Sequence, residues 1–398
     1  MKKLSMLCTL FLFVVTGCGV VQQNETRERR LDHPPGPRET VDREVNPQRL
    51  LQVKSGDETQ SKRDHAMMKR GIETLGFIDP SAPKVAAEDI YKTADHLTYV
   101  SFFNYRVKSD GSLVHLNDLT PLQATRQKQA IPMMVITNLG EDNYSPEVAH
   151  TLFTTPKMAD RLADNVIKVM KDKGYRALNI DFEFIQETDQ KLYNDFLGKF
   201  IPKVKKEGYT VSTDLAPKTS DEQKGPWAGA HDYAFHGQVA DFVVLMTYDW
   251  AWNTGPPMPV APIPEMRKVL DYAVTKIPKE KIMLGFPLYG YDWILPYKEG
   301  NPPARLVTPQ RAARIAQQKA AKIHFDNQDE CPFFYYLDAK GRKHMVWFEN
   351  EQSAQAKFNL VKEYGIRGIA YWALGREFDR NWSLLHENFN ILKYGPTQ

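Results

Sequence analysis

The sequence predicts an α/β protein whose main body, residues 66–398, is a closed (β/α)8 TIM barrel with a small α+β insertion between strands 7 and 8. Three observations predict this fold. Eight apolar runs of strand length follow one another, mostly separated by helical patterns, which indicates a parallel sheet. Several helices end at a glycine directly before a strand. Eight strands in roughly 325 residues suit a closed barrel better than an open sheet.

The predicted strands are short apolar runs bounded by turn residues or by helical patterns. Alternation of apolar residues and clear boundaries place them at 74–78, 97–105, 132–137, 177–184, 209–214, 242–248, 282–289 and 366–372.

A repeated order of helix, glycine and strand supports these assignments. Leu162, Val166 and Met170 share one face of a predicted helix. Gly174 follows, and glycine accommodates the left-handed conformation that commonly ends a helix. The same order recurs before the strands at 209–214 and 366–372.

The interval from about 291 to 352 is too long for a simple connection between a strand and a helix. It contains a helical pattern at 309–323 and strand-like runs at 333–337 and 344–348. We expect it to form the α+β insertion and one wall of a cleft at the barrel mouth.

The N-terminus has the pattern of an export signal. Lys2 and Lys3 precede an apolar run of about a dozen residues, which is too short to cross a bilayer. The run ends at Cys18 in a context that resembles the bacterial lipoprotein box. We expect a signal peptide at 1–17, lipidation of Cys18, and a flexible polar tether at 18–65.

Composition excludes several classes of function. The net charge is only +3, without a long basic block in the main body, so no nucleic-acid partner is expected. Cys331 is the single cysteine beyond the proposed lipid site, which leaves no intrachain disulfide framework. His231 and His236 are spaced unlike a helical metal pair, and we expect surface or hydrogen-bonded residues. No phosphate-binding glycine loop is present, and no metal or cofactor is predicted.

The strand at 177–184 carries the candidate chemistry. Asn179, Asp181 and Glu183 alternate with apolar residues, so they share one face of the strand. The apolar face suits packing against helices, and the polar face then points into the barrel toward its C-terminal mouth. Neighbouring buried carboxylates repel each other, so one of them retains its proton to higher pH. A carboxylic acid of this kind is required to cleave a glycosidic bond.

The sequence around this strand resembles glycoside hydrolase family 18. Residues 175–183 are similar to the family signature, which ends in a D-x-D-x-E strand. The resemblance implies that Glu183 is the catalytic acid and that Asp181 orients the N-acetyl group of the substrate. Asn179 stands where the signature has its first acid.

Further segments resemble other motifs of the family. Residues 246–249 resemble the sixth-strand motif, which implies that Tyr248 contacts the reacting acetamido group. Residues 285–290 and 368–372 resemble the seventh- and eighth-strand motifs. The remaining residues that we expect to bind substrate are Met246, Asp249, Trp250, Tyr289 and Trp372, together with Asn179.

Several of these residues also have simpler interpretations. Trp372 could be core packing, although an aromatic residue in a barrel favours a role in the cleft, and Met246 is expected mainly to line the core. Two roles remain open for Trp250, Trp252 and Trp293: their rings stack on sugars of the substrate, or they pack the loops. Whether Asn138 and Asp214 reach the mouth is also open.

Residues 250–264, 289–293 and 346–349 resemble the bacterial spore-germination and cortex-lytic N-acetylglucosaminidases. This resemblance implies a retaining reaction in which the acetamido oxygen of the substrate is the nucleophile. We expect N-acetylglucosaminyl bonds of peptidoglycan as substrate, in spore cortex, and a monomer anchored at Cys18 to the outer face of the bacterial cytoplasmic membrane or to a spore membrane. The alternatives are a non-catalytic glycan-binding barrel and a chitinase that acts on chitooligosaccharides.

Overall fold

The computed structural model describes residues 69–141 and 143–394. The predicted signal peptide, Cys18 and the tether lie outside the described residues, and these assignments stay predictions. Within the described part, none of the helices combines the length and apolarity that crossing a membrane requires.

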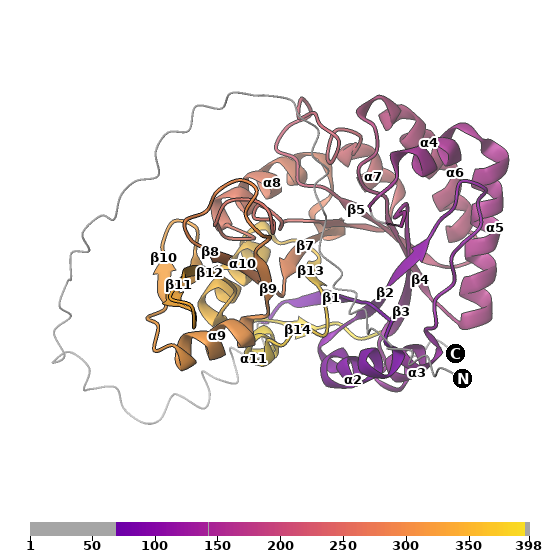
Figure 1. Cartoon of the computed structure of the whole chain (residues 1–398). Helices are drawn as coiled ribbons and strands as arrows, with labels where there is room; N and C mark the ends of the chain where they lie inside the picture. The colour runs from indigo at the N-terminus through magenta and orange to yellow at the C-terminus, as the bar shows by residue number, and fades with distance from the viewer. Residues whose placement is uncertain (1–68, 142, 395–398) are drawn as a thin grey trace, which may run out of the picture. The chain divides into compact units, whose positions relative to one another are not determined.

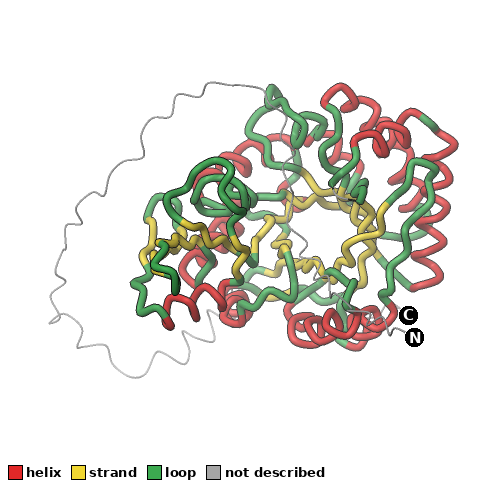
Figure 2. The backbone as a smooth tube through the Cα atoms, viewed as in Figure 1, coloured by secondary structure: helices red, strands yellow, loops and turns green. Residues whose placement is uncertain are grey.

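Eight parallel strands form a closed barrel, as predicted. Neighbouring strands pair in chain order, and β13 closes the ring by pairing with β1 over Glu73–Gly76. Figure 2 shows this ring of strands with helices outside it. A short additional strand, β14 (Asn390–Ile391), pairs with the start of β1. The barrel strands are β1 (Gly71–Ile78), β2 (Tyr99–Arg106), β3 (Ile131–Thr137), β4 (Ala177–Asp181), β5 (Thr210–Leu215), β6 (Phe242–Leu245), β7 (Ile282–Pro287) and β13 (Gly368–Trp372).

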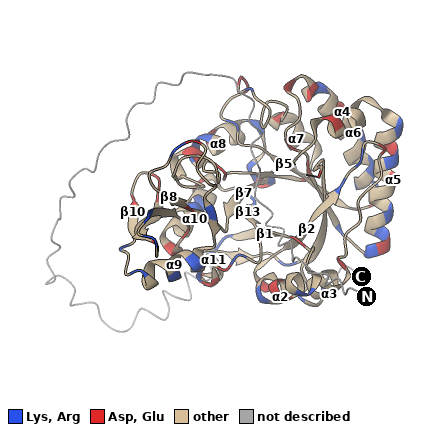
Figure 3. Cartoon of the chain, in the orientation of Figure 1, with Lys and Arg blue, Asp and Glu red and all other residues tan. Residues whose placement is uncertain are grey.

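Helices cover the outside of the barrel (Figure 1). They carry many charged side chains, as α5 and α6 show in Figure 3, while the barrel strands are almost uncharged. Gly174 ends α5 in the left-handed conformation, with φ 69°, as predicted. The helices of this layer are α2 (Pro83–Thr93), α3 (Leu119–Gln127), α4 (Pro146–Thr154), α5 (Pro156–Lys173), α6 (Gln190–Lys205), α7 (Tyr233–Val239), α8 (Ile263–Lys276), α10 (Glu351–Tyr364) and α11 (Asp379–Asn388).

Three strands end earlier than the sequence predicts. The predicted strands at 177–184, 242–248 and 282–289 end at Asp181, Leu245 and Pro287. Pairing explains the difference, because the last ladder partner of β4 is Asp181 and that of β6 is Leu245. The apolar pattern continues into loops at the mouth, where burial persists without a neighbouring strand.

The insertion lies between β7 and β13, as predicted, and it contains more strands than expected. Its antiparallel sheet has the order β10-β11-β12-β8-β9, and α9 (Pro309–Gln318) packs on one face. The short runs β9 and β10 had no clear pattern in the sequence. The strands are β8 (Gly290–Ile294), β9 (Arg305–Val307), β10 (His324–Asp326), β11 (Cys331–Leu337) and β12 (Lys343–Trp347).

An apolar cluster and an ion pair fill the barrel interior below the mouth. The barrel interior holds a cluster that includes Leu75, Met133 and Phe242. Below it, the guanidinium of Arg367 pairs with both carboxylate oxygens of Glu73 at 2.7 Å. The amino-terminal end of the barrel is therefore filled and ion-paired, which leaves the carboxyl-terminal end for a site.

Candidate active site

The acidic face of β4 lies inside the barrel, as the alternation of the sequence predicts. Asn179 and Asp181 are buried strand residues, and Glu183 follows two residues after the strand ends. Glu183 is 2% exposed. Its backbone therefore sits at the mouth, and its carboxyl group is shielded from bulk water.

Two side chains from other elements hold the chain at Glu183. Asn138 follows β3, and its Oδ1 accepts a hydrogen bond from Glu183 N while its Nδ2 donates to Glu183 O, both at 2.9 Å. His231 Nδ1 accepts from Ala216 N at 2.9 Å, so its Nε2 carries the proton and faces Phe182 O at 3.2 Å. Burial lowers the pKa of His231 to about 4, which keeps the ring neutral. His231 and His236 are thus hydrogen-bonded as expected, but both are fully buried and neither lies on the surface.

The environment of the Glu183 carboxyl group favours its protonated form. Burial raises the pKa of Glu183 to about 8, and the charge of Asp181 adds to the increase. Trp227 Nε1 donates to Glu183 Oε2 at 2.6 Å, and this hydrogen bond opposes the shift because it stabilises the carboxylate. At neutral pH the group therefore holds a proton that it can donate.

Asp181 lies between Glu183 and a second buried acid. Tyr144 Oη donates to Asp181 Oδ2 at 2.9 Å, while Asp181 Oδ1 is buried without a hydrogen-bond partner among the described residues. Burial raises the pKa of Asp181 well above its ordinary value, and repulsion by Asp214 adds to this effect. The unpartnered oxygen is available to a ligand that carries an N–H or O–H donor.

Asp214 reaches the interior of the barrel from β5, a position that the sequence left open. Asn179 Nδ2 donates to Asp214 Oδ1 at 2.7 Å and to Ser212 Oγ at 2.9 Å. Burial raises the pKa of Asp214, and the hydrogen bond from Asn179 opposes the increase. An amide at position 179 therefore supplies a donor where an acid would add a further negative charge to the cluster.

A second group of residues lies after β6 and β7. Tyr248 is buried, and its hydroxyl is close enough to Asp214, Asp249, Asp181 and Glu183 for their charges to raise its pKa further. Asp249 has φ 62°, a left-handed conformation that is uncommon for a residue with a side chain. It accepts a hydrogen bond from Tyr289 Oη. Burial raises the pKa of Asp249 to about 6, and the Tyr289 hydrogen bond and Arg376 oppose the increase.

The tryptophans separate into two roles. Trp372, at the end of β13, is partly exposed above the interior cluster, with edge contacts to Phe77 at 5.5 Å and Phe103 at 4.9 Å. It therefore closes the core and presents a surface at the mouth. Trp293 is 2% exposed and donates to Gly255 O at 2.9 Å, which makes it a loop-packing residue.

Met246 and Trp250 flank Tyr248 and Asp249 in the chain. Met246 is buried, and its backbone N–H donates to Leu215 O at 2.9 Å. Trp250 is partly buried, and its backbone N–H donates to Val260 O at 3.1 Å. Met246 therefore lines the core, as expected, and Trp250 packs against the same core while it stays partly exposed.

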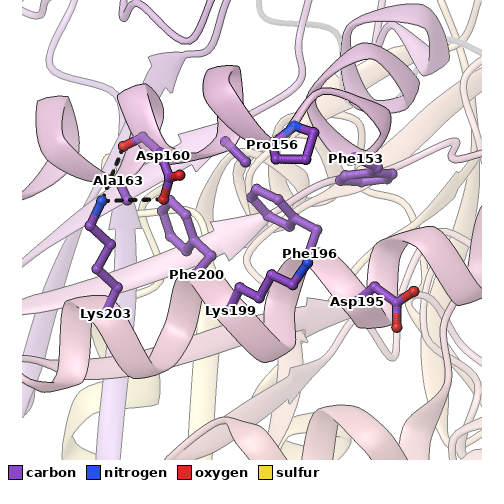
Figure 4. A pocket seen from close by; sticks show the side chains of 10 residues that line it. Phe153, Pro156, Asp160, Ala163, Asp195, Phe196, Lys199, Phe200 and Lys203 are labelled. Carbon is purple, nitrogen blue, oxygen red and sulfur yellow. Dashed lines mark hydrogen bonds and ion pairs between the residues drawn. The ribbon is translucent and has the colours of Figure 1, made fainter.

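The described residues hold no group of three or more His, Cys, Asp or Glu side chains that could bind a metal ion. Cys331 is buried, as a packed thiol, and burial raises its pKa, which disfavours the reactive thiolate. The hollow in Figure 4 lies between α5 and α6 in the outer helix layer, and none of the candidate site residues lines it.

A family model described as Glycosyl hydrolases family 18 matches residues 73–377. The chain belongs to this family. The resemblance seen in the sequence is therefore confirmed, and the chain is a glycosidase.

Comparison with individual proteins shows how close the similarity is. The cortical fragment-lytic enzyme of Bacillus subtilis (strain 168) is 43% identical over 330 residues, which cover 82% of this chain and 76% of that protein. The crystal structure of the spore cortex-lytic enzyme SleL from Bacillus megaterium QM B1551 has a TM-score of 0.79 at 41% identity, covering 82% of this chain and 76% of that one. A chitinase from Chromobacterium violaceum ATCC 12472 has a TM-score of 0.73 at 25% identity, covering 80% and 99%.

Four residues of this family 18 site were absent from the sequence-based candidates. Tyr144 and Trp227 come from loops after β3 and β5, and each is an aromatic residue in a polar loop, which is a weak signal. His231 was assigned no role at the site. Arg376 follows β13 in a loop without a recognisable motif. Nothing in the local sequence shows that these segments converge.

Proposed function

We propose that this glycosidase hydrolyses N-acetylglucosaminyl bonds in peptidoglycan of the spore cortex, with retention of configuration and with Glu183 as acid and base. The observation that carries the proposal is the buried carboxyl group of Glu183 at the mouth of a family 18 barrel, where it accepts a hydrogen bond from Trp227 and where burial raises its pKa to about 8. The similarity to cortical fragment-lytic enzymes supports the choice of substrate.

In the first step the acetamido oxygen of the substrate attacks the anomeric carbon, and the bond to the leaving oxygen breaks. Glu183 gives its proton to that oxygen, and the sugar becomes a cyclic oxazolinium ion. Asp181 and Tyr248 position the acetamide and stabilise the developing charge. A water molecule then attacks the anomeric carbon from the face opposite the acetamido oxygen, and the bond between that carbon and the acetamido oxygen breaks, which regenerates the N-acetyl group. Glu183 takes a proton from the water, which restores the acid. No second carboxylate nucleophile is needed, so Asp214 and Asp249 act through their charge and hydrogen bonds.

The test is digestion of purified spore cortex, vegetative peptidoglycan and chitooligosaccharides by the full-length chain, with Glu183→Gln alongside. Reduced products are identified by mass spectrometry. New reducing ends at N-acetylglucosamine, from cortex and from the wild type alone, are the expected result. Cleavage of chitooligosaccharides alone would favour the chitinase alternative. Retained glycan binding without cleavage of any of the three substrates would favour a glycan-binding barrel.

We further propose that the enzyme is exported and anchored through a lipidated Cys18 to the outer face of the cytoplasmic membrane or to a spore membrane. The signal-like residues 1–17 and the polar segment 18–65 support this proposal. Expression in the native host followed by membrane fractionation tests it. The wild type is expected in the membrane fraction and Cys18→Ala in the soluble fraction, and equal partitioning of the two would refute the anchor.

A further inference from the structure

The hairpin that joins β11 to β12 exposes two large apolar side chains. Leu337 is 60% exposed and Tyr335 is 39% exposed. Tyr336 packs with the apolar cluster around α9, so Tyr335 and Leu337 lie on the opposite face of the sheet, because side chains alternate along a strand. Figure 1 shows the sheet of the insertion beside the barrel, with β10 and β11 on its outer side. We call residues 335–343 the tip hairpin.

Three lysines lie on or next to the tip hairpin. Lys343 Nζ is 4.6 Å from the centroid of the Tyr335 ring, and Lys319 Nζ is 5.9 Å from the centroid of the Tyr336 ring. Lys340 is exposed in the turn between the two strands. Within the part of the chain that the structure describes, none of the three lysines forms an ion pair with a carboxylate.

The single acid of the tip hairpin does not offset the charge of these lysines. Asp338 Oδ2 lies 2.7 Å from Arg342 Nη2, and it faces His344 Nε2 at 3.4 Å. Lysines of the outer helices differ, since Lys168 and Lys191 lie 2.5 and 2.6 Å from aspartates one helical turn away. The tip hairpin therefore presents an excess of positive charge beside exposed apolar side chains.

This combination fits an anionic membrane surface better than it fits a soluble polyanion. A soluble polyanion would pair with the lysines but would leave Leu337 and Tyr335 in water. At a membrane surface the lysine ammonium groups reach the lipid phosphates, while apolar side chains enter the boundary between headgroups and acyl chains. Cross-strand pairing places Leu337 directly opposite Lys343, so one contact engages both kinds of side chain.

We propose that the tip hairpin docks on a membrane surface that carries anionic lipid headgroups. Lys319, Lys340 and Lys343 bind lipid phosphates, and Leu337 and Tyr335 enter the interface. The inference goes beyond the proposed cleavage of glycans, because it uses none of the residues at the barrel mouth. It is also separate from the proposed lipid anchor, since it requires no modification of Cys18.

The test is sedimentation of full-length Cys18→Ala protein, which cannot be lipidated at this position, with two kinds of vesicle. One contains phosphatidylcholine alone, and the other contains about 30% phosphatidylglycerol. We expect tighter binding to the anionic vesicles, and weaker binding as the salt concentration rises. Lys340→Gln with Lys343→Gln should weaken binding about 25-fold, or about fivefold for each charge. Leu337→Asn should weaken it about 5- to 10-fold.

Matched changes on α2 are the controls, because Lys84, Lys92 and Val85 are exposed there. Lys84→Gln with Lys92→Gln, and separately Val85→Asn, should leave vesicle binding unchanged. Residues 1–68 are the same in every variant, so their contribution to binding cancels in each comparison.

A further arm measures binding to soluble poly(glycerol phosphate), which offers phosphates without an acyl layer. We expect the protein to bind this polymer more weakly than the anionic vesicles, and Leu337→Asn to have no effect on that binding. Equal affinity for polymer and vesicles, with no effect of Leu337→Asn on either, would assign the tip hairpin to a soluble polyanion and overturn the proposal. No preference for anionic vesicles, or equal losses in the tip hairpin and α2 variants, would overturn it as well.

Discussion

The side-chain amide of Asn138 forms two hydrogen bonds with the backbone of Glu183, one to its N–H and one to its C=O, each at 2.9 Å. The two residues are 45 positions apart and lie in the loops after neighbouring strands. This pairing replaces the ladder contacts that end at Asp181. It fixes the direction in which the Glu183 side chain leaves the barrel rim.

Asn138→Ala is therefore expected to reduce kcat more than it changes KM. The substitution removes three hydrogen bonds to backbone groups, those with Glu183 N, Glu183 O and Ser145 O, and each loss costs about 1–3 kcal/mol of stability. Release of reducing ends should fall about 10- to 100-fold, since small misplacement of a catalytic group is costly. Asn165→Ala removes a comparable hydrogen bond to Gly111 O, remote from the site, and serves as control. A variant with lower stability but unchanged kcat would show that Asn138 has no positioning role.

Glu183→Gln should remove cleavage almost completely, by a factor of about 10² to 10⁴, because the amide cannot donate a proton. The amide is similar in shape to the acid, and it is uncharged, so burial costs no more than for the protonated acid. Thermal unfolding should show a Tm equal to or above that of the wild type at pH 8. Residual activity above one tenth of the wild type would exclude Glu183 as the acid.

The pH profile of kcat should fall as pH rises through about 8, because Glu183 loses its proton there. Trp227→Phe removes the donor that stabilises the carboxylate, so the pKa of Glu183 should increase and the alkaline limb should move up by about one pH unit. Trp382→Phe, which alters a tryptophan of the outer helix α11 that is stacked on His96 and packed against Tyr371, is the control. A limb that stays in place or moves down would contradict this assignment.

Asn179→Asp is expected to destabilise the protein increasingly as pH rises. The substitution removes the donor to Asp214 and adds a carboxyl group between acids whose pKa values are already raised. A group whose pKa is higher in the folded state is tolerated while protonated, and its contribution to stability is lost as pH rises above the unfolded value of about 4. The deficit in Tm relative to the wild type should therefore be larger at pH 8 than at pH 5.

Asn359→Asp places the same change on an exposed position of α10 and should show no such dependence on pH. An equal deficit in Tm at both pH values for Asn179→Asp would mean that the new carboxyl group stays neutral or reaches solvent. The measurement is differential scanning calorimetry at the two pH values.

A buried ion pair joins the end of the insertion to α10. We expect that removal of one partner alone destabilises the protein more than removal of both. Lys357 Nζ lies 2.9 Å from Glu349 Oε2, and both side chains are almost completely buried. Lys357→Met leaves an unpaired buried carboxylate, so urea unfolding should show a loss of about 3–5 kcal/mol. Adding Glu349→Leu should recover part of that loss. Arg380→Met breaks an exposed pair and should cost less than about 1 kcal/mol.

The alternation of polar and apolar residues, and the order of strands and helices along the chain, were enough to predict the barrel. Strand β4 shows why, because its polar residues Asn179 and Asp181 point inward whenever its apolar residues pack on helices. The glycine at 174 marked the end of α5 for a local reason, the left-handed backbone conformation. Strand ends at the mouth were less predictable, since ladder partners rather than apolar residues decide where a strand stops.

The sequence by itself determined the order of strands, the inward face of β4, and the two acids at its end, because these depend on neighbours one to four residues away. Tertiary structure alone decided what surrounds those acids. Tyr144, Trp227 and Arg376 come from separate loops, and they meet because a closed barrel brings the carboxyl ends of all its strands to one rim. Burial at that rim raises the pKa of Glu183. The local sequence pattern cannot predict this burial, because loops that are distant in the chain exclude the water.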